Sequence, residues 1–253
     1  MHYDHIGVLK PAFRGENNYR YYSPEQMSDV NLIRTCLSLD IPLHAIVSLH
    51  KSRTPESVAE ILERQGMLIE SKIEELARAR KLLHTLKKTI SSASLVVEDT
   101  IITKYLQPEA IVLGELTDYS QGRTNYSALA SFYSDCAERY PDMDLNYPVS
   151  CMFTEYQIKQ RDWLWPERYY MHNPEGYDKR PGSLYAIGYT RGGYGSGTIL
   201  FERLIEYIDA NGLEVCGPAY EEYPLNEISI CERNNYLIRI MITVREEKKI
   251  GKR

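Results

Sequence analysis

The sequence predicts an α+β protein with three parts: a small helical head, one long helix and a larger domain built on an antiparallel sheet. Three observations predict this organisation. Short helical patterns and turn residues alternate over residues 1–52, and residues 54–89 then keep helical spacing with Gly66 as their one internal Gly. Beyond residue 108, strand and helix patterns follow the order βαββ twice, which indicates an internal duplication. Two such units commonly share one antiparallel sheet and leave a cleft between it and their helices.

The overall composition predicts a soluble globular protein. Of the 253 residues, 43% are apolar and 26% are charged. No apolar run is long enough for a secretion signal or a membrane helix, so we expect a cytoplasmic protein without membrane contacts. Residues 1–90 carry 13 basic and 11 acidic side chains, whereas residues 91–253 carry 17 and 24. This asymmetry suits an N-terminal part that contacts phosphate groups and a C-terminal part that binds a cationic partner.

The cysteines and tyrosines indicate which kinds of binding site the chain can form. The five cysteines are scattered, form no Cys-x-x-Cys pair and have no His at metal-ligand spacing, so we expect reduced thiols, no metal site and no cofactor. Tyrosine is unusually frequent, with 21 residues against 4 Phe. A Tyr-rich domain is typical of a ligand pocket, but tyrosine also favours β-sheet, and both interpretations stay open.

Two short helices are expected in the head. Ser23 is a good N-cap, Pro24 suits the first helical position, and apolar residues recur at helical spacing up to Leu37. A second helix is expected to start near Pro42.

The long helix is expected to begin at Thr54, an N-cap followed by Pro55, and to run to residue 89. An apolar residue recurs every seven positions in one row: Leu62, Ile69, Leu76, Leu83 and Ile90. The second heptad row is mixed, with Gln65, Lys72, Ala79 and Leu86, which suits an antiparallel pairing better than a parallel coiled coil. We therefore expect a homodimer formed through residues 54–90.

The larger domain is expected to contain six strands and two helices. The strands are residues 109–119, 147–157, 167–173, 183–194, 213–224 and 235–246, and the helices are residues 123–140 and 196–212. The stretch "GYTRGGYGSG" (188–197) lacks the Lys-Ser/Thr of a phosphate-binding loop, so we interpret it as a flexible loop that borders the cleft.

A hairpin is expected close to the N-terminus, with its tip at residues 15–18. Asn and Gly tolerate the positive φ angles that such a tip requires. Arg14 and Arg20 flank the tip as phosphate donors, and Tyr19, Tyr21 and Tyr22 add hydroxyl donors.

This hairpin resembles the wing of the MerR family of transcription regulators. The positions that carry the resemblance are His2, Tyr3, Asp4, Ile6, Gly7, Leu9, Pro11, Asn17, Tyr19, Arg20 and Tyr22. The resemblance implies a winged helix-turn-helix head over residues 1–53 and double-stranded promoter DNA as a partner. The contact residues it implies are Arg14, Asn17, Tyr19, Arg20, Tyr21 and Tyr22.

The sequence departs from the family pattern at three places. Asn18 stands where the family usually has Gly, Phe13 stands near a position where a polar or basic residue is common, and Met1 stands where the family has Arg. In that family a helix and most of a recognition helix precede this point. We therefore expect a partial head and poor, non-specific DNA binding by this exact chain.

Residues 109–247 resemble the GyrI-like effector-binding domain of BmrR-like multidrug regulators, through the duplication, "GPAYEEY" (217–223) and "NNYLIRIMITV" (234–244). Residues 91–108 would link it to the long helix. The resemblance implies a small lipophilic cation as effector, with Glu221 as its counter-ion and Glu222 on the opposite face of the strand. Aromatic faces beside a carboxylate suit such a ligand. The aromatic candidates are Tyr147, Tyr170, Tyr185, Tyr220, Trp163 and Trp165.

Three functions remain open from the sequence. The first is a ligand-responsive transcription regulator, and the second is a drug-sequestering protein with a vestigial head. The third is a hydrolase, since some GyrI-like domains resemble hydrolases, although no Ser-His-Asp or Cys-His set supports catalysis. Metal sensing is rejected, because residues 50–60 contain no Cys.

Overall fold

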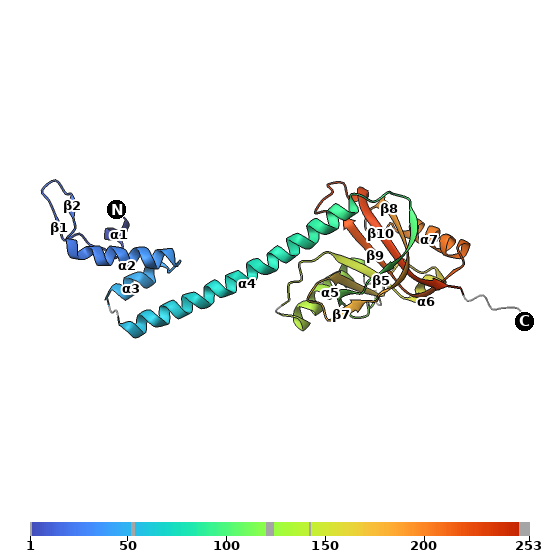
Figure 1. Cartoon of the computed structure of the whole chain (residues 1–253), viewed down its shortest axis with the longest axis horizontal. Coiled ribbons are helices and arrows are strands. Elements are labelled where there is room, and N and C mark those ends of the chain that lie inside the picture. The colour runs from blue at the N-terminus through green and yellow to red at the C-terminus, as the bar shows by residue number, and fades with distance from the viewer. Residues whose placement is uncertain (1, 52–53, 120–123, 142, 248–253) are drawn as a thin grey trace, which may run out of the picture. The chain divides into compact units, whose positions relative to one another are not determined.

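The computed structural model describes residues 2–51, 54–119, 124–141 and 143–247. Met1 and Arg123, which belong to the expected wing and to an expected helix, lie outside these residues. The chain divides into two compact units, Met1–Ala79 and Arg80–Arg253, each described here by itself. The predicted α+β class is confirmed by helices and an antiparallel sheet (Figure 1). Among the described residues, no helix has the length and apolar character needed to cross a membrane.

The first unit contains short helices and a hairpin. Its elements are α1 (His2–His5), β1 (Phe13–Arg14), β2 (Arg20–Tyr21), η1 (Pro24–Gln26), α2 (Met27–Ser38) and α3 (Leu43–Lys51). Ser23 caps the turn that precedes α2, and its N–H donates to Gln26 Oε1 at 3.0 Å. The buried core is formed by Val8, Leu9, Ile33, Cys36, Ile41, Ile46 and Leu49. Both helices expected in the head are confirmed.

The long helix α4 (Pro55–Ala93) has 39 residues, four more at its C-terminal end than the sequence predicted. At 1.5 Å per residue it is about 58 Å long. Thr54 acts as the predicted N-cap, since the Ser57 N–H donates to Thr54 Oγ1 at 3.1 Å.

The second unit is built on one eight-stranded sheet with the order β3-β8-β10-β9-β5-β6-β4-β7. Its strands are β3 (Ile101–Leu106), β4 (Glu109–Leu113), β5 (Val149–Phe153), β6 (Arg168–His172), β7 (Asp178–Arg180), β8 (Ser183–Gly192), β9 (Leu213–Leu225) and β10 (Tyr236–Glu246). Its helices are the end of α4, α5 (Asn125–Arg139), α6 (Glu155–Gln160) and α7 (Thr198–Ala210).

The predicted duplication is confirmed by the strand order. The repeats β4-α5-β5-β6 and β8-α7-β9-β10 contribute the strand sets β4-β6-β5 and β8-β10-β9, which meet edge to edge through β5 and β9. At this junction Cys151 pairs with Glu221 and Met152 with Tyr220. Glu221 therefore lies where the two repeats join.

The two faces of the sheet are covered differently. Leu204 of α7 and Ile240 of β10 belong to one buried cluster, and Phe132 of α5 and Tyr169 of β6 belong to another. Cys151 packs against both, so α5 and α7 share one face, which we call the helix face. On the opposite face, Ala93 at the end of α4 joins a small cluster on β9 and β10.

The structure differs from the sequence prediction in three main places. The strand expected over residues 109–119 ends at Leu113. Residues 155–157, expected to continue a strand, begin α6, because Thr154 caps a helix and accepts a hydrogen bond from the Gln157 N–H at 3.3 Å. The strands β3 and β7 were not expected. They occupy the two edges of the sheet, where exposed residues weaken the alternation of apolar and polar side chains.

Candidate functional site

The N-terminal hairpin has the expected tip. Asn18 adopts a φ of 61°, which an Asn tolerates in the place of Gly, and its N–H donates to the Gly15 carbonyl at 2.8 Å. Asn17 Oδ1 accepts from the Tyr19 N–H at 3.1 Å. The rings of Phe13 and Tyr21 stack with centroids 4.7 Å apart.

Both arginines of the hairpin contact one carboxylate. Asp4 of α1 accepts from Arg14 Nη2 and from Arg20 Nε, each at 2.6 Å. The hydrogen bond from Arg20, reinforced by Arg14, lowers the pKa of Asp4. Arg14 also donates to Asn18, whereas the two terminal nitrogens of Arg20 have no partner among the described residues. Asp4 thus holds both guanidinium groups beside the tip and leaves Arg20 able to donate outward.

The three predicted hairpin tyrosines are exposed: Tyr19, Tyr21 and Tyr22 keep 69%, 44% and 38% of their surface. They lie on the same hairpin as the arginines, so the structure brings together all six predicted DNA-contact residues. Cationic side chains with exposed hydroxyls suit contacts to phosphate oxygens.

The second candidate site lies around Glu221 on the helix face. Side chains alternate along β9, so Ala219, Glu221 and Tyr223 share that face, whereas Tyr220 and Glu222 share the opposite one. Glu221 is 4% exposed and accepts a short hydrogen bond from the Tyr223 hydroxyl. Burial raises its pKa, and the hydrogen bond from Tyr223 offsets only part of that effect. No Lys, Arg or His pairs with Glu221 in the described part of the chain.

The loop of residues 192–197 covers Glu221. A side chain at Gly197 would meet Glu221 Oε2 at 3.0 Å, so the chain approaches closely at this point. The Gly195 N–H donates to the Tyr223 hydroxyl at 2.8 Å. Tyr194 packs on Tyr223, with ring centroids 4.5 Å apart, and its hydroxyl donates to an exposed carboxylate, Glu227, at 2.5 Å. This loop was predicted to border the cleft, whereas Tyr194 and Tyr223 were not among the predicted site residues. The period of two along "Glu-Glu-Tyr" could have placed Tyr223 beside Glu221.

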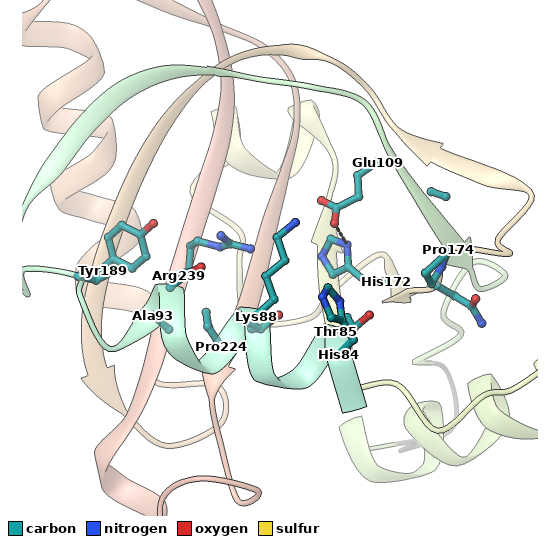
Figure 2. A pocket seen from close by; sticks show the side chains of 15 residues that line it. His84, Thr85, Lys88, Ala93, Glu109, His172, Pro174, Tyr189, Pro224 and Arg239 are labelled. Atoms are coloured by element: carbon teal, nitrogen blue, oxygen red, sulfur yellow. Dashed lines mark ion pairs between the residues drawn. The ribbon is translucent and has the colours of Figure 1, made fainter. Parts of the chain in front are cut away.

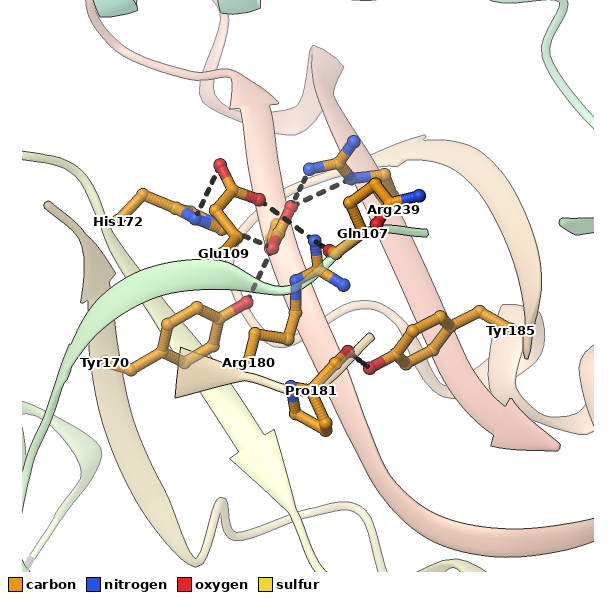
Figure 3. Close-up of polar contacts among 9 residues, drawn as sticks. Gln107, Glu109, Tyr170, His172, Arg180, Pro181, Tyr185 and Arg239 are labelled. Carbon is orange, nitrogen blue, oxygen red and sulfur yellow. Dashed lines mark hydrogen bonds and ion pairs between the residues drawn. The ribbon is translucent and has the colours of Figure 1, made fainter. Parts of the chain in front are cut away.

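Glu222, the adjacent carboxylate, is fully paired on the opposite face. Figure 3 shows its partners Tyr170, His172 and Arg239. Glu222 accepts from Arg239 Nε at 2.8 Å, from Tyr170 Oη at 2.6 Å and from His172 Nε2 at 2.7 Å. Burial would raise the pKa of Glu222, but Arg239 and His172 outweigh burial and hold it well below the usual range.

Glu109 completes this network. Burial would lower the pKa of His172, but Glu222 and Glu109 outweigh burial and raise it to about 9. His172 Nδ1 lies 3.3 Å from Glu109 Oε1. This contact, together with the Arg180 guanidinium, lowers the pKa of Glu109 to about 2. His172 is therefore cationic and both carboxylates are anionic at neutral pH. These partners could not be predicted from the sequence, because His172, Arg180 and Arg239 lie 17 to 50 residues from Glu222 and no local pattern relates them to it.

The predicted aromatic residues are divided between the two faces. Tyr170, Tyr185 and Tyr220 are buried in the cluster on the face that carries Glu222, so the structure does not bring them to Glu221. Trp163 lies in the cluster under α7, and Tyr147 lies in the cluster under α5. Trp165 is 38% exposed and packs against Tyr119 with ring centroids 4.9 Å apart. Register along the strands, which composition does not reveal, causes this separation.

A cavity of about 450 Å³ lies between the end of α4 and the face of the sheet that carries Glu222 (Figure 2). Residues of α4 that line it include His84, Thr85, Lys88 and Thr89. From the sheet side, Glu109, His172, Tyr189 and Arg239 line it. Within the described residues, no three His, Cys, Asp or Glu side chains are arranged to hold a metal ion.

Comparison with known proteins identifies the family. The family model described as "MerR HTH family regulatory protein" matches residues 1–52. The multidrug-efflux transporter 2 regulator of Bacillus subtilis is 32% identical over 97% of this chain and 90% of its own length. The transcriptional regulator BrlR of Pseudomonas aeruginosa is 35% identical over 36% of this chain and 34% of its own length. Among solved structures, EcmrR in a complex with DNA covers 96% of this chain and 92% of its own, with 18% identity and a TM-score of 0.44. The chain belongs to the MerR family of helix-turn-helix transcriptional regulators.

Proposed function

We propose that this protein is a cytoplasmic, ligand-responsive regulator that binds promoter DNA as a homodimer and senses a lipophilic aromatic cation beside Glu221, without catalysing a reaction. Its Bacillus subtilis relative is named as a regulator of a multidrug-efflux transporter, which supports a drug-like effector. One observation carries the proposal: Glu221 is a buried carboxylate whose hydrogen-bond partner is a neutral hydroxyl.

The contrast with Glu222 indicates which carboxylate receives the ligand. A buried carboxylate without a cation is costly by several kcal/mol, and a bound cation offsets that cost. Glu221 can gain such a partner. At Glu222 a ligand would have to displace Arg239 or His172 and leave that cation unpaired.

The aromatic wall of this site is proposed to be Tyr223 and Tyr194, which supersede the predicted residues on the Glu222 face. Their rings are packed together, and the Tyr223 hydroxyl contacts Glu221. Trp163 lies in the same helix-face cluster as Tyr223 and stacks on Phe201, with ring centroids 5.1 Å apart. Each ring that faces a cation contributes ~0.5–2 kcal/mol. Since Glu221 is buried, we propose that the glycine-rich loop 192–197 moves to admit the ligand.

Tetraphenylphosphonium, an aromatic cation, tests this site. We expect the Glu221→Gln variant to bind it at least about tenfold more weakly than the unmodified chain, because one charge-assisted contact of at least about 1.4 kcal/mol is lost. Trp fluorescence or calorimetry measures the affinity. Glu232→Gln, which removes the same charge from an exposed position of the same unit, is the matched control and should bind normally.

Three results would count against the proposed function. Equal affinity of the unmodified chain and Glu221→Gln would exclude Glu221 as the counter-ion. Hydrolysis of an ester that is abolished in Glu221→Gln would instead favour a hydrolase. Cation binding by a chain that never engages duplex DNA would favour a drug-sequestering protein.

The long helix supports the homodimer. Its apolar heptad row is exposed in the single chain: Leu62, Ile69, Leu76 and Leu83 keep 46%, 38%, 69% and 67% of their surface. A row of large apolar side chains on one side of a helix is typical of a surface that pairs with another helix. We propose that a second copy covers it in the antiparallel orientation.

The hairpin supports the DNA contact, and Arg20 provides the test. We expect Arg20→Gln to weaken binding to a mixed-sequence duplex and to reduce the slope of log affinity against log salt by about 0.9 per lost phosphate contact. Fluorescence anisotropy at several salt concentrations measures that slope. Arg34→Gln, an exposed change on α2, is the control. An unchanged slope in Arg20→Gln, or an equal change in Arg34→Gln, would exclude Arg20 as a phosphate contact.

A further inference from the structure

We infer that the cavity beneath the end of α4 is a second ligand site, with the opposite charge preference: it takes a small organic anion whose carboxylate, sulfonate or phosphate group is attached to an apolar body. The cavity lies on the Glu222 face of the sheet, so it is separate from the helix face that carries Glu221.

The charges around the cavity give a positive surplus. Lys88, Arg239 and protonated His172 line it, and Arg180 lies directly behind Glu109. The carboxylates of this cluster are Glu109 and Glu222, so four cationic groups face two anionic ones, a surplus of two. Glu109 is held by His172 and Arg180, and Glu222 by His172, Arg239 and Tyr170. The two carboxylates are thus occupied, and the surplus remains for a ligand.

Several donors in this cluster have no partner. Lys88 makes no ion pair among the described residues, and Figure 2 shows its side chain extending from α4 between Arg239 and His172. Arg180, which is 4% exposed and does not itself line the cavity, pairs with Glu109, and its buried Nε and Nη1 have no hydrogen-bond partner among the described residues. Buried guanidinium nitrogens are usually satisfied. Lys88 is therefore available to pair with an anion in the cavity, and the positive charge of Arg180 behind Glu109 adds to the attraction.

Hydroxyl groups of α4 complete the polar end. Thr85, Thr89 and Ser92 line the cavity with Lys88, at a spacing that puts all four on one side of the helix. The side-chain hydroxyls of these three residues have no hydrogen-bond partner among the described residues. Ammonium, guanidinium and hydroxyl donors together are the groups that recognise an oxyanion.

The other end of the cavity is apolar. Tyr189, Ala93 and Pro224 lie near Arg239, on the side of Lys88 away from His172 (Figure 2). Tyr189 is half-buried and adds an aromatic ring to this end of the lining. A volume of about 450 Å³ suits a small organic molecule rather than a bare ion, because ligand pockets usually span ~300–1,000 Å³.

Calorimetric titration of the full chain with naphthalene-2-sulfonate at low ionic strength tests the inference. We expect saturable binding of one anion per chain, weakened at least about tenfold in Lys88→Gln. The matched control is Lys87→Gln, which removes the same charge from the neighbouring exposed residue outside the cavity, and it should change the affinity less than about twofold. Glu221→Gln should leave anion binding unchanged, so this test is independent of the cation site.

Three outcomes would overturn the inference. The first is no saturable binding of the sulfonate. The second is equal weakening in Lys87→Gln and Lys88→Gln, which would indicate unspecific attraction to a basic helix. The third is equal binding of naphthyl-2-trimethylammonium at the same cavity, because a site with a surplus of cations should reject it.

Discussion

Replacing Glu222 with Gln should lower the free energy of unfolding of the second unit by about 3–5 kcal/mol, because it removes the carboxylate from a buried charged network. Arg239 and His172 would lose their shared anion, and Tyr170 would lose a charged acceptor. An amide can accept a hydrogen bond but cannot neutralise two cations. This is the largest loss of stability that we expect from a single substitution on this sheet.

Chemical denaturation followed by Trp fluorescence measures this loss. Both tryptophans, Trp163 and Trp165, lie in the second unit, so the signal reports its unfolding. A loss below about 1 kcal/mol would contradict the network, because that is the range of an exposed ion pair.

Replacing Glu221 with Gln should have the opposite effect and raise the free energy of unfolding by about 1–2 kcal/mol at pH 7. The amide removes a buried charge that has no cationic partner, and its oxygen can still accept from Tyr223. Since the two substitutions are chemically identical and adjacent on β9, each is the control for the other.

The pH dependence of this gain has a definite sign. The pKa of Glu221 is raised in the folded protein, so the carboxylate reduces stability as pH rises from 4.5 through the folded pKa. Below pH 4.5 the group is protonated in both states and the penalty is absent. The advantage of Glu221→Gln should therefore be present at pH 7 and vanish near pH 4. Equal stability of the two chains at both pH values would show that Glu221 carries no such penalty.

Much of the fold could be predicted because its signals are local. Thr54 caps the long helix, and the apolar heptad row along that helix indicates that it is long. The repeated βαββ pattern predicts the duplicated sheet. The short helix α6 was missed, because the strand residues before it run directly into the cap at Thr154. The edge strands β3 and β7 were missed because their exposed side chains carry a weak pattern.

The candidate sites were predictable only in part. Because Glu221 and Glu222 are adjacent in a strand, the sequence indicated that they lie on opposite faces. In the structure Glu221 accepts from a neutral hydroxyl, whereas Glu222 is paired with cations. Which tyrosines share a face with Glu221 depends on the register of separate strands, so a high tyrosine count could not identify them. The partners of Glu222 come from β6 and β10, and only the folded sheet brings them together.

Thermal denaturation of the unmodified chain and of Glu221→Gln, each with and without tetraphenylphosphonium, tests the claim that Glu221 is the buried counter-ion of a cationic effector. At a ligand concentration ~100-fold above its dissociation constant, the unmodified chain should gain about 2.7 kcal/mol. Glu221→Gln should start more stable and gain less than about 1.5 kcal/mol at the same concentration, because its affinity is at least about tenfold lower. An equal gain in both chains would contradict the claim.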